Sequence, residues 1–247
     1  YTDSMNNMQN VIEYYDELYP SDESQKQFFT NLLSSYGIPS KFLRIGCGTG
    51  YLESFLAKEG VDVTGLDTNK EILERANLRR RFPNMAIRFF QMSTIEMTNF
   101  LGKGFYNVIA CLNDKIIYIH DEALLKKFFV DCKLLLSDSG TLVLQLYNYN
   151  ALKTESSIKL PNRESIRSKI MEQITKTQTE GFVINQYLEN SAGKIIPLLQ
   201  KQKVYPILPE KITEYALEAN FSKVEFFEDY TKKPFTPESK TILCLIS

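Results

Sequence analysis

The chain has 247 residues, with 29 basic side chains, 30 acidic side chains and one histidine. Hydrophobic residues make up 43% and charged residues 24%, the ordinary balance of a globular domain. A formal net charge of −1 gives no electrostatic footprint for nucleic acid or for an anionic membrane. No apolar run approaches the roughly 20 residues that span a bilayer, and residues 1–20 show no secretory leader. We therefore expect no nucleic-acid partner and no membrane partner.

The four cysteines, Cys47, Cys111, Cys132 and Cys244, are far apart and form no C-x-x-C pair. Neither a zinc site nor a redox pair is indicated, so we expect no metal. Reduced thiols are typical of the cytoplasm, which is the location that we expect. The single histidine, His120, excludes mechanisms that need several histidines.

Residues 1–40 are expected to form a helical lead-in or cap. Between Phe28 and Tyr36, apolar side chains recur at the spacing of one helix face. Gly37 and Pro39 follow, as glycine and proline usually do where a helix ends.

Residues 41–150 alternate between short apolar strands and helical patterns. Strands are expected at 41–45, 61–66, 86–91, 106–112 and 141–147, with helices at 51–59, 69–81 and 121–136. A turn at Ser139-Gly140 is expected to lead into the fifth strand. Strands that alternate with helices predict βαβ units, and hence a parallel sheet with right-handed crossovers.

The pattern changes in residues 151–206. Extended segments are expected near 165–175, 181–188 and 194–205, although weak alternation leaves a helix open for the first. We interpret 151–206 as an antiparallel flap or lid, which either shapes a pocket or forms a dimer contact. Residues 207–247 return to the core, with a helix at 212–219 and strands at 224–227 and 241–246.

The most informative segment is Arg44-Ile45-Gly46-Cys47-Gly48-Thr49-Gly50, between the first strand and its helix. Glycines let the backbone turn sharply and let a ligand approach main-chain atoms, and the helix that follows presents free N–H groups. Open α/β sheets bind ligands at this carboxyl end of their strands. The dinucleotide fingerprint G-x-G-x-x-G fails here, because Tyr51 occupies its last position.

The spacing G-x-G-x-G, followed by Asp67 at the end of the next strand, resembles the class I S-adenosylmethionine-dependent methyltransferases. Other segments are similar to the same family: 14–20 to its Tyr-Asp-rich N-terminal helix, 105–109 to its fourth strand and 138–144 to the turn before its fifth. Residues 145–150 resemble a strand ending of relatives near glycine N-methyltransferases. The resemblance is good over 10–150, moderate over 205–247 and general over 151–206.

The resemblance implies an α/β, Rossmann-like, doubly wound fold, with a mostly parallel seven-stranded sheet and a small antiparallel β insertion. It implies a cap at 1–40, a cofactor-binding core at 41–150, a flap at 151–206, and a last helix and two strands at 207–247. The implied activity is transfer of a methyl group from S-adenosylmethionine, by in-line displacement, to an N or O atom of a small molecule. A monomer and a homodimer are both left open.

The resemblance also implies a set of cofactor-binding residues. The glycines would hold the methionyl part and the ribose through their backbone, and Asp67 would hold the ribose hydroxyls. Aromatic side chains of the lead-in, Tyr15 among them, would close the pocket, or else simply pack in the core. The full set is Gly46, Cys47, Gly48, Gly50, Asp67, Thr68, Ile72, Met92, Ser93, Thr94, Leu112, Asn113, Tyr14 and Tyr19.

Some polar residues after the fourth and fifth strands are candidates for contacting the methyl acceptor, and we call their part of the site the acceptor side. They are Asp114, Tyr118, His120, Tyr147 and Asn148. Tyr147 and His120 are the candidate catalytic residues, with a surface or capping histidine as the alternative for His120. The sequence Asn113-Asp114-Lys115-Ile116 is unlike the Asn/Asp-Pro-Pro-Tyr/Phe pattern of amide and base N-methyltransferases. It therefore argues against DNA adenine as the substrate.

Three sites depart from the family pattern, one of which is Tyr106-Asn107, where many members have Phe-Asp. Arg44 stands where the family usually has Asp or Glu, which inverts the local charge unless the arginine turns away or pairs with a carboxylate. Ser93 or Gln91 stands near the position of an acid that accepts from adenine. These departures keep open a methyltransferase-like binding module without turnover. An RNA or protein methyltransferase is a further alternative, which the neutral charge disfavours.

Overall fold

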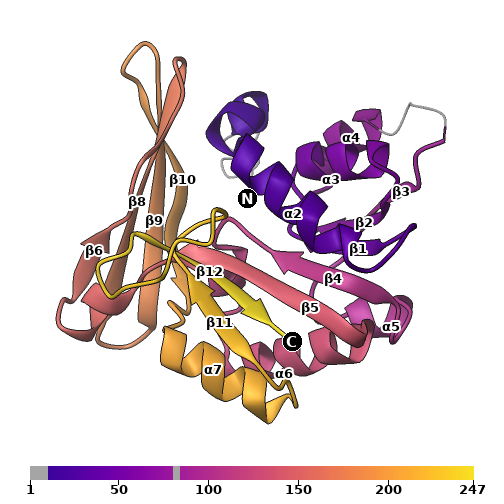
Figure 1. The fold of residues 1–247 in the computed structure, drawn as a ribbon. Coiled ribbons are helices and arrows are strands. Elements are labelled where there is room, and N and C mark those ends of the chain that lie inside the picture. The colour runs from indigo at the N-terminus through magenta and orange to yellow at the C-terminus, as the bar shows by residue number, and fades with distance from the viewer. Residues whose placement is uncertain (1–10, 80–83) are drawn as a thin grey trace.

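The computed structural model describes residues 11–79 and 84–247. Its centre is a seven-stranded sheet with the order β11-β12-β5-β4-β1-β2-β3 (Figure 1). Five strands are parallel, and β12 and β11 complete one edge in the antiparallel sense. The strands are β1 (Lys41–Ile45), β2 (Asp62–Asp67), β3 (Ile87–Gln91), β4 (Tyr106–Cys111), β5 (Leu136–Tyr147), β11 (Val224–Phe227) and β12 (Thr241–Ile246). The predicted Rossmann-like α/β fold is confirmed.

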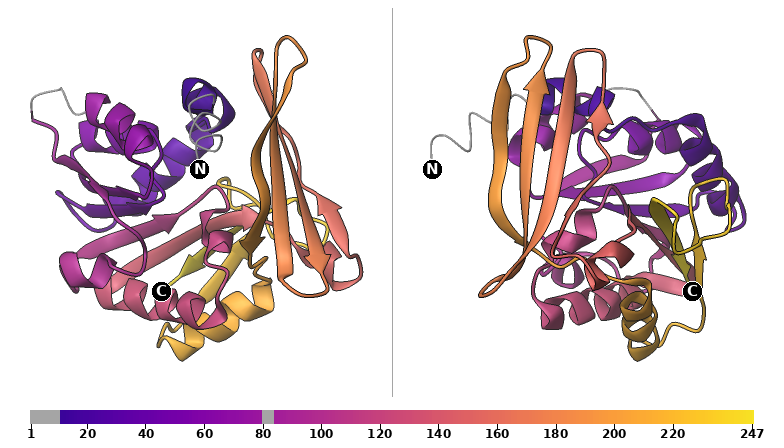
Figure 2. Two further views of the ribbon diagram at one scale, coloured as in Figure 1. Left: turned by 180° about the vertical axis from the view of Figure 1, so that it is seen from behind. Right: turned by 90° about the vertical axis from the view of Figure 1, so that its left-hand side faces the viewer.

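Helices cover both faces of this sheet (Figure 2). Alternate side chains of a strand point to opposite faces, so Phe42 of β1 packs with one group of helices while Leu43 packs with the other. The first group is α2 (Glu23–Ser34), α3 (Tyr51–Lys58) and α4 (Lys70–Leu78), and the second is α5 (Met97–Phe100), α6 (Glu122–Leu135) and α7 (Pro209–Glu218). Within the described residues, no helix is both long and apolar enough to cross a membrane.

A second, antiparallel sheet stands beside the core and faces the N-terminal helix at residues 11–18 (Figures 1 and 2). We call this sheet the flap. It contains β6 (Ser157–Lys159), β7 (Arg163–Glu164), β8 (Ser168–Thr177), β9 (Gly181–Asn190) and β10 (Ile195–Val204). Its order is β10-β9-β8-β6, and β7 also pairs with β8. The segment for which a helix was left open therefore belongs to a strand, β8.

The flap is attached to the core by packing and by backbone. Ile174 and Ile184 of the flap share a buried cluster with Tyr149 of the core, and Tyr205 N–H donates to the Ile117 carbonyl at 2.7 Å. Ile170 packs with Leu18 of the N-terminal helix. The flap therefore touches both the core and the helix that precedes it.

The start of β5 differs from the prediction. α6 ends at Leu135 and β5 begins at Leu136, whereas the strand was expected to begin at 141 after a turn. The pairing with β4 shifts between Tyr106 and Val108, which absorbs the extra residues in a bulge. At Gly140 a Cβ atom would lie 3.0 Å from the Tyr106 carbonyl oxygen, so the glycine marks this close approach instead of a turn between elements.

Substituting Phe129→Ala tests the packing of α6. Phe129 is fully buried, with its ring centroid 5.7 Å from Phe128 and 6.0 Å from Tyr215. We expect the free energy of unfolding to fall by about 3–5 kcal/mol, because the change opens a cavity. The neighbouring change Val130→Ala, at a side chain that is 51% exposed, should stay within about 0.5 kcal/mol. Urea unfolding measures both, and equal losses would contradict the packing described.

Candidate functional site

A cavity of about 470 Å³ lies where the parallel strands end. Its walls come from the ends of β1, β2 and β4, the N-terminal helix, the 3-10 helix η2 (Lys115–Tyr118) and the inner side of the flap. Parallel α/β sheets bind ligands at this edge. The volume falls within the range of about 300–1,000 Å³ that small-molecule sites occupy.

Most of the residues expected to bind the cofactor meet at this cavity. Those on its wall are Gly46, Asp67, Thr68, Ile72, Met92, Ser93, Thr94, Asn113 and Tyr19. Segments separated by up to about ninety residues are therefore brought together at one place. Their role in binding remains a prediction at this stage.

The other expected residues lie outside the cavity wall. Cys47 and Leu112 are buried in the core cluster beneath the loop, and Gly50 faces the ring of Phe89. Tyr14 points to the flap instead, where it packs in the cluster of Leu18 and Ile170. Gly48 is covered by Tyr15, whose side chain lies directly on the loop.

Asp67 is held in place by two backbone hydrogen bonds. Its Oδ2 accepts from the Gly48 N–H and its Oδ1 accepts from the Asn69 N–H, both at 3.0 Å. The Asn69 side chain in turn caps α4 by accepting from the Ile72 N–H at 3.0 Å. Each carboxylate oxygen keeps a further lone pair for a ligand. One carboxylate thus joins the glycine loop, β2 and α4 on the cavity wall.

The glycine loop is shaped so that other side chains can lie on it. Gly46 and Gly48 have φ angles of 70° and 57°, which favour glycine. A Cβ atom at Gly48 would overlap the hydroxyl of Tyr15, and one at Gly46 would lie 2.9 Å from Cγ of Lys115. Tyr15 is buried, and this burial raises its pKa well above the ordinary value. The loop is therefore covered on the cavity side by Tyr15 and Lys115.

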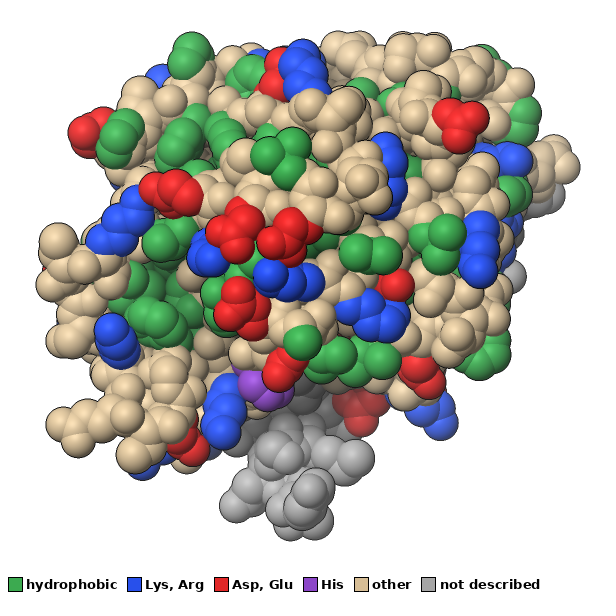
Figure 3. Space-filling view, turned by 90° about the horizontal axis from the view of Figure 1, so that it is seen from below, with side chains coloured by type: hydrophobic (Ala, Val, Ile, Leu, Met, Phe, Trp, Pro, Cys, Tyr) green, Lys and Arg blue, Asp and Glu red, His purple; other side chains and the backbone are tan. Residues whose placement is uncertain are grey.

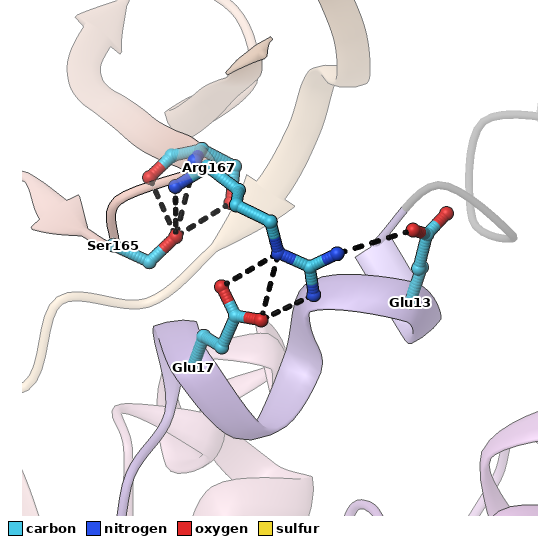
Figure 4. Close-up of polar contacts among 5 residues, drawn as sticks. Glu13, Glu17, Ser165 and Arg167 are labelled. Carbon is cyan, nitrogen blue, oxygen red and sulfur yellow. Dashed lines mark hydrogen bonds and ion pairs between the residues drawn. The ribbon is translucent and has the colours of Figure 1, made fainter. Parts of the chain in front are cut away.

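The N-terminal helix bridges the flap and the glycine loop. On the flap side, Arg167 donates from Nε to Glu17 at 3.0 Å and lies 3.6 Å from Glu13, while the Ser165 hydroxyl accepts from the Arg167 N–H (Figure 4). On the loop side, Asp16 contacts both the Thr49 hydroxyl and Arg79. Arg79, which follows α4, thus helps to fix the N-terminal helix to the glycine loop.

The structure shows how the charge of Arg44 is compensated. Arg44 is buried on the face of β1 that packs against α3, outside the cavity wall, with its Nε 3.9 Å from Oε1 of Glu53. Burial raises the pKa of Glu53, and the nearby Arg44 opposes that rise. An acid at position 44 would face the Glu53 carboxylate and repel it. The inverted charge is therefore compensated beneath the loop and does not point at the cavity.

Asp114 is the buried acid of the acceptor side. It follows β4 with a φ of 65°, and its Oδ1 accepts from the Tyr147 N–H at 3.0 Å. Its Oδ2 accepts from the Tyr149 hydroxyl, and the residue lies on the cavity wall. Burial raises the pKa of Asp114 to about 7, although these two hydrogen bonds oppose the rise. The carboxyl group is therefore poised to exchange a proton near neutral pH.

The two candidate catalytic residues lie elsewhere. His120 is exposed and outside the cavity wall, and Figure 3 shows the histidine at the surface, among acidic and basic side chains. The Tyr147 hydroxyl donates to the Pro161 carbonyl at 3.3 Å, and burial raises its pKa to about 12, so it stays protonated near neutral pH. Asn148 binds the carbonyls of Pro237 and Ser239. We therefore leave His120 and Tyr147 out of the acid–base roles.

The flap supplies residues that the sequence did not single out. Arg163, Glu172 and Gln186 lie on the cavity wall, and Gln186 donates to Glu172 at 2.7 Å across the β8–β9 pairing. No motif surrounds these residues. A signal existed in the alternation of Ile170 and Ile174, which places Glu172 on the same inward side, but only the observed register brings Gln186 opposite to it.

Comparison with known proteins places this geometry in a class. Residues 42–140 match the family model of the methyltransferase domain. The CcbJ methyltransferase of Streptomyces caelestis superposes with a TM-score of 0.76 and 18% identity, over 96% of this chain and 95% of that one. CalS10, an amino pentose methyltransferase from Micromonospora echinaspora that was solved with S-adenosylmethionine, gives 0.66 and 16%, over 96% of each chain.

Among curated proteins, the ubiquinone biosynthesis O-methyltransferase of Vibrio campbellii is 34% identical over 110 residues, 44% of this chain and 45% of its own length. The chain spans 55% or less of the length of the first curated relatives that it matches. The fold and the site thus define a methyltransferase-type α/β protein. Residues 42–140 therefore belong to the methyltransferase-domain family, and the chain as a whole shares the fold of the S-adenosylmethionine-dependent methyltransferases on which it superposes.

Substituting Gly48→Ala tests the contact between the glycine loop and the N-terminal helix. The new Cβ would displace Tyr15, so we expect chymotrypsin to cleave the N-terminal helix faster than in the unchanged protein. Gly181→Ala is the matched control, because φ is 75° there but no atom lies within 4 Å of the added Cβ. Mass spectrometry of the fragments measures the rates. Equal protection of both variants would contradict the contact.

The raised pKa of Asp114 predicts how stability depends on pH. Its ordinary value is 3.8 and its folded-state value is about 7, so the folded state holds more protons between these values. This group therefore lowers the free energy of unfolding as pH rises from about 4 to about 7, by at most about 1.4 kcal/mol per pH unit. Asp114→Asn should remove this slope, because an amide does not titrate. Urea unfolding of both proteins from pH 4 to pH 8 measures the difference, and parallel curves would contradict the assignment.

Proposed function

We propose that the protein is an S-adenosylmethionine-dependent methyltransferase that methylates an N or O atom of a small molecule. One observation carries the proposal: the glycine loop and the Asp67 carboxylate share a single cavity with polar groups of the flap. This arrangement offers one place for a nucleoside and an adjoining place for an acceptor. Relatives named for ubiquinone biosynthesis and for an amino pentose support small acceptors.

The residues present fit the cofactor. The free lone pairs of Asp67 suit the two ribose hydroxyls, and the apolar side chains of Ile72 and Met92 suit the faces of an adenine. Gly46 lies on the same wall, with the side chain of Lys115 against it. Thr68, Ser93 and Thr94 complete this half of the wall. When bound, S-adenosylmethionine supplies a methyl group that its positively charged sulfur has already activated.

The chain itself contributes position and a dry environment. The flap and the N-terminal helix both line the cavity, so they would hold an acceptor close to the cofactor and limit the access of water. Orienting two reactants in this way lowers a barrier by about 7–11 kcal/mol in favourable cases. Asn113 is fixed at the end of β4, because its N–H donates to Oε1 of Gln145 at 2.8 Å.

Asp114 is our candidate for the general base. An acceptor that arrives protonated must lose a proton, and the Asp114 carboxylate is on the wall to receive it. A base whose pKa lies near the working pH adds about 10²–10⁴-fold to a rate. This role replaces the ones first considered for His120 and Tyr147.

The alternatives have less support. A binding module without turnover was motivated by Arg44, which pairs with Glu53 away from the cavity. An RNA or protein substrate would have to enter beneath the flap and the N-terminal helix. A cytoplasmic location remains part of the proposal and is in keeping with four free, buried cysteines. Size-exclusion chromatography with light scattering distinguishes the monomer from the homodimer.

Substituting Asp67→Ala tests the cofactor site. The change removes a charged acceptor from the ribose, so we expect the Kd for S-adenosylhomocysteine to rise at least about tenfold. Asp62→Ala is the matched control on the same strand, because Asp62 pairs with Arg88 at the opposite end, 2.8 Å away. Isothermal titration calorimetry measures both. Absence of binding to the unchanged protein would overturn the proposed function itself.

A further inference from the structure

Arg163 lies on the cavity wall with a carboxylate beside it but without a hydrogen bond to that carboxylate. Its side chain is 18% exposed and forms an ion pair with Glu172, and among the described residues it makes no hydrogen bond. The buried Nε has no partner, and the nearest carboxylate oxygen, Oε2 of Glu172, is 3.8 Å from it. A guanidinium has five N–H donors and is always charged, so its burial without acceptors is costly.

Aromatic packing nevertheless fixes this side chain. The guanidinium carbon lies 4.7 Å from the ring centroid of Tyr19 and 5.2 Å from that of Tyr147. The hydrogen bond from Tyr147 to the Pro161 carbonyl holds the second ring. Rings that stack on an arginine hold its plane and leave its N–H groups free for another partner. The position of Arg163 is therefore set before any ligand arrives.

The protein supplies the charge opposite to Arg163 but not its hydrogen bonds. Glu172 gives one oxygen, Oε1, to Gln186, while its Oε2 has no hydrogen-bond partner. Asp114, the other acid on this side, already accepts from Tyr147 and Tyr149. Arg163 and Glu172 together carry almost no net charge, but the guanidinium still lacks the hydrogen-bond acceptors that it requires.

We propose that Arg163 binds a carboxylate group of the methyl acceptor, so that the substrate is a small organic acid. This inference rests on the proposed function, because it takes the flap half of the cavity as the acceptor site. A planar carboxylate matches the guanidinium fork with two parallel hydrogen bonds. A phosphate dianion would bring more negative charge beside Glu172 and Asp114, which disfavours it.

The test measures binding of benzoate and of its neutral analogue benzamide by ligand-observed saturation-transfer NMR. It is carried out in a chloride buffer, with and without S-adenosylhomocysteine. The unchanged protein should bind benzoate at least about tenfold more tightly than benzamide, as expected for a charge-assisted pair. Arg163→Gln should abolish this preference, and Arg163→Lys should keep only part of it, since lysine lacks the fork. Lys176→Gln, an exposed change on the same flap, should keep all of it.

Three outcomes overturn the inference: equal binding of benzoate and benzamide, an unchanged preference in Arg163→Gln, or inorganic phosphate that competes as well as benzoate. Where Arg163→Gln fails to fold, Glu172→Gln replaces it. Removing the neighbouring carboxylate should tighten benzoate binding several-fold, and no change would contradict the proposal. Calorimetry with S-adenosylhomocysteine on the unchanged protein tests the proposed function separately. If S-adenosylhomocysteine does not bind, the proposed function is overturned, whereas the preference for benzoate over benzamide decides whether Arg163 binds a carboxylate.

Discussion

The site depends on the carboxylate of Asp67 and its two backbone partners. By accepting from Gly48 and Asn69, this side chain fixes the glycine loop relative to β2 and to the start of α4. Hydrogen bonds to a charged acceptor are stronger than neutral ones, and here they join segments from two βαβ units. The glycine loop in turn supports Tyr15, and through it the helix that covers the cavity. The N-terminal helix is thus positioned over the cavity through a series of contacts that begins at Asp67.

The core half of the site could be predicted because its information is local. Strand, glycine loop and acid follow one another within about 25 residues, and the edge at which parallel strands end follows from topology. The same logic predicted the core sheet and both C-terminal strands. The predicted start of β5 at residue 141 was wrong, because Gly140 lies at a bulge and the sequence does not distinguish a bulge from a turn.

The site residues that the flap contributes could not be predicted, because their positions depend on the strand register and on which way each side of a helix faces. β7 has two residues, too few for any periodicity, yet it carries Arg163. Tyr14 and Tyr15 are neighbours that differ by about 100° around a helix, and only the packed structure shows that one faces the flap and the other the loop. Likewise, His120 looked chemically suitable, but it follows the short helix η2 and is exposed.

The ion pairs of the N-terminal helix have a consequence for its attachment to the cavity walls. This helix contacts the flap through Arg167 and the loop through Asp16, and these groups are substantially exposed to solvent. Dissolved salt screens such charges over about 8 Å at physiological ionic strength. Added electrolyte therefore weakens the ionic part of both attachments together, while the packing of Leu18 on Ile170 and of Tyr15 on the glycine loop is not ionic and persists. One helix thus carries exposed ion pairs to both the flap and the loop side of the cavity, and the strength of both sets depends on the same ionic surroundings.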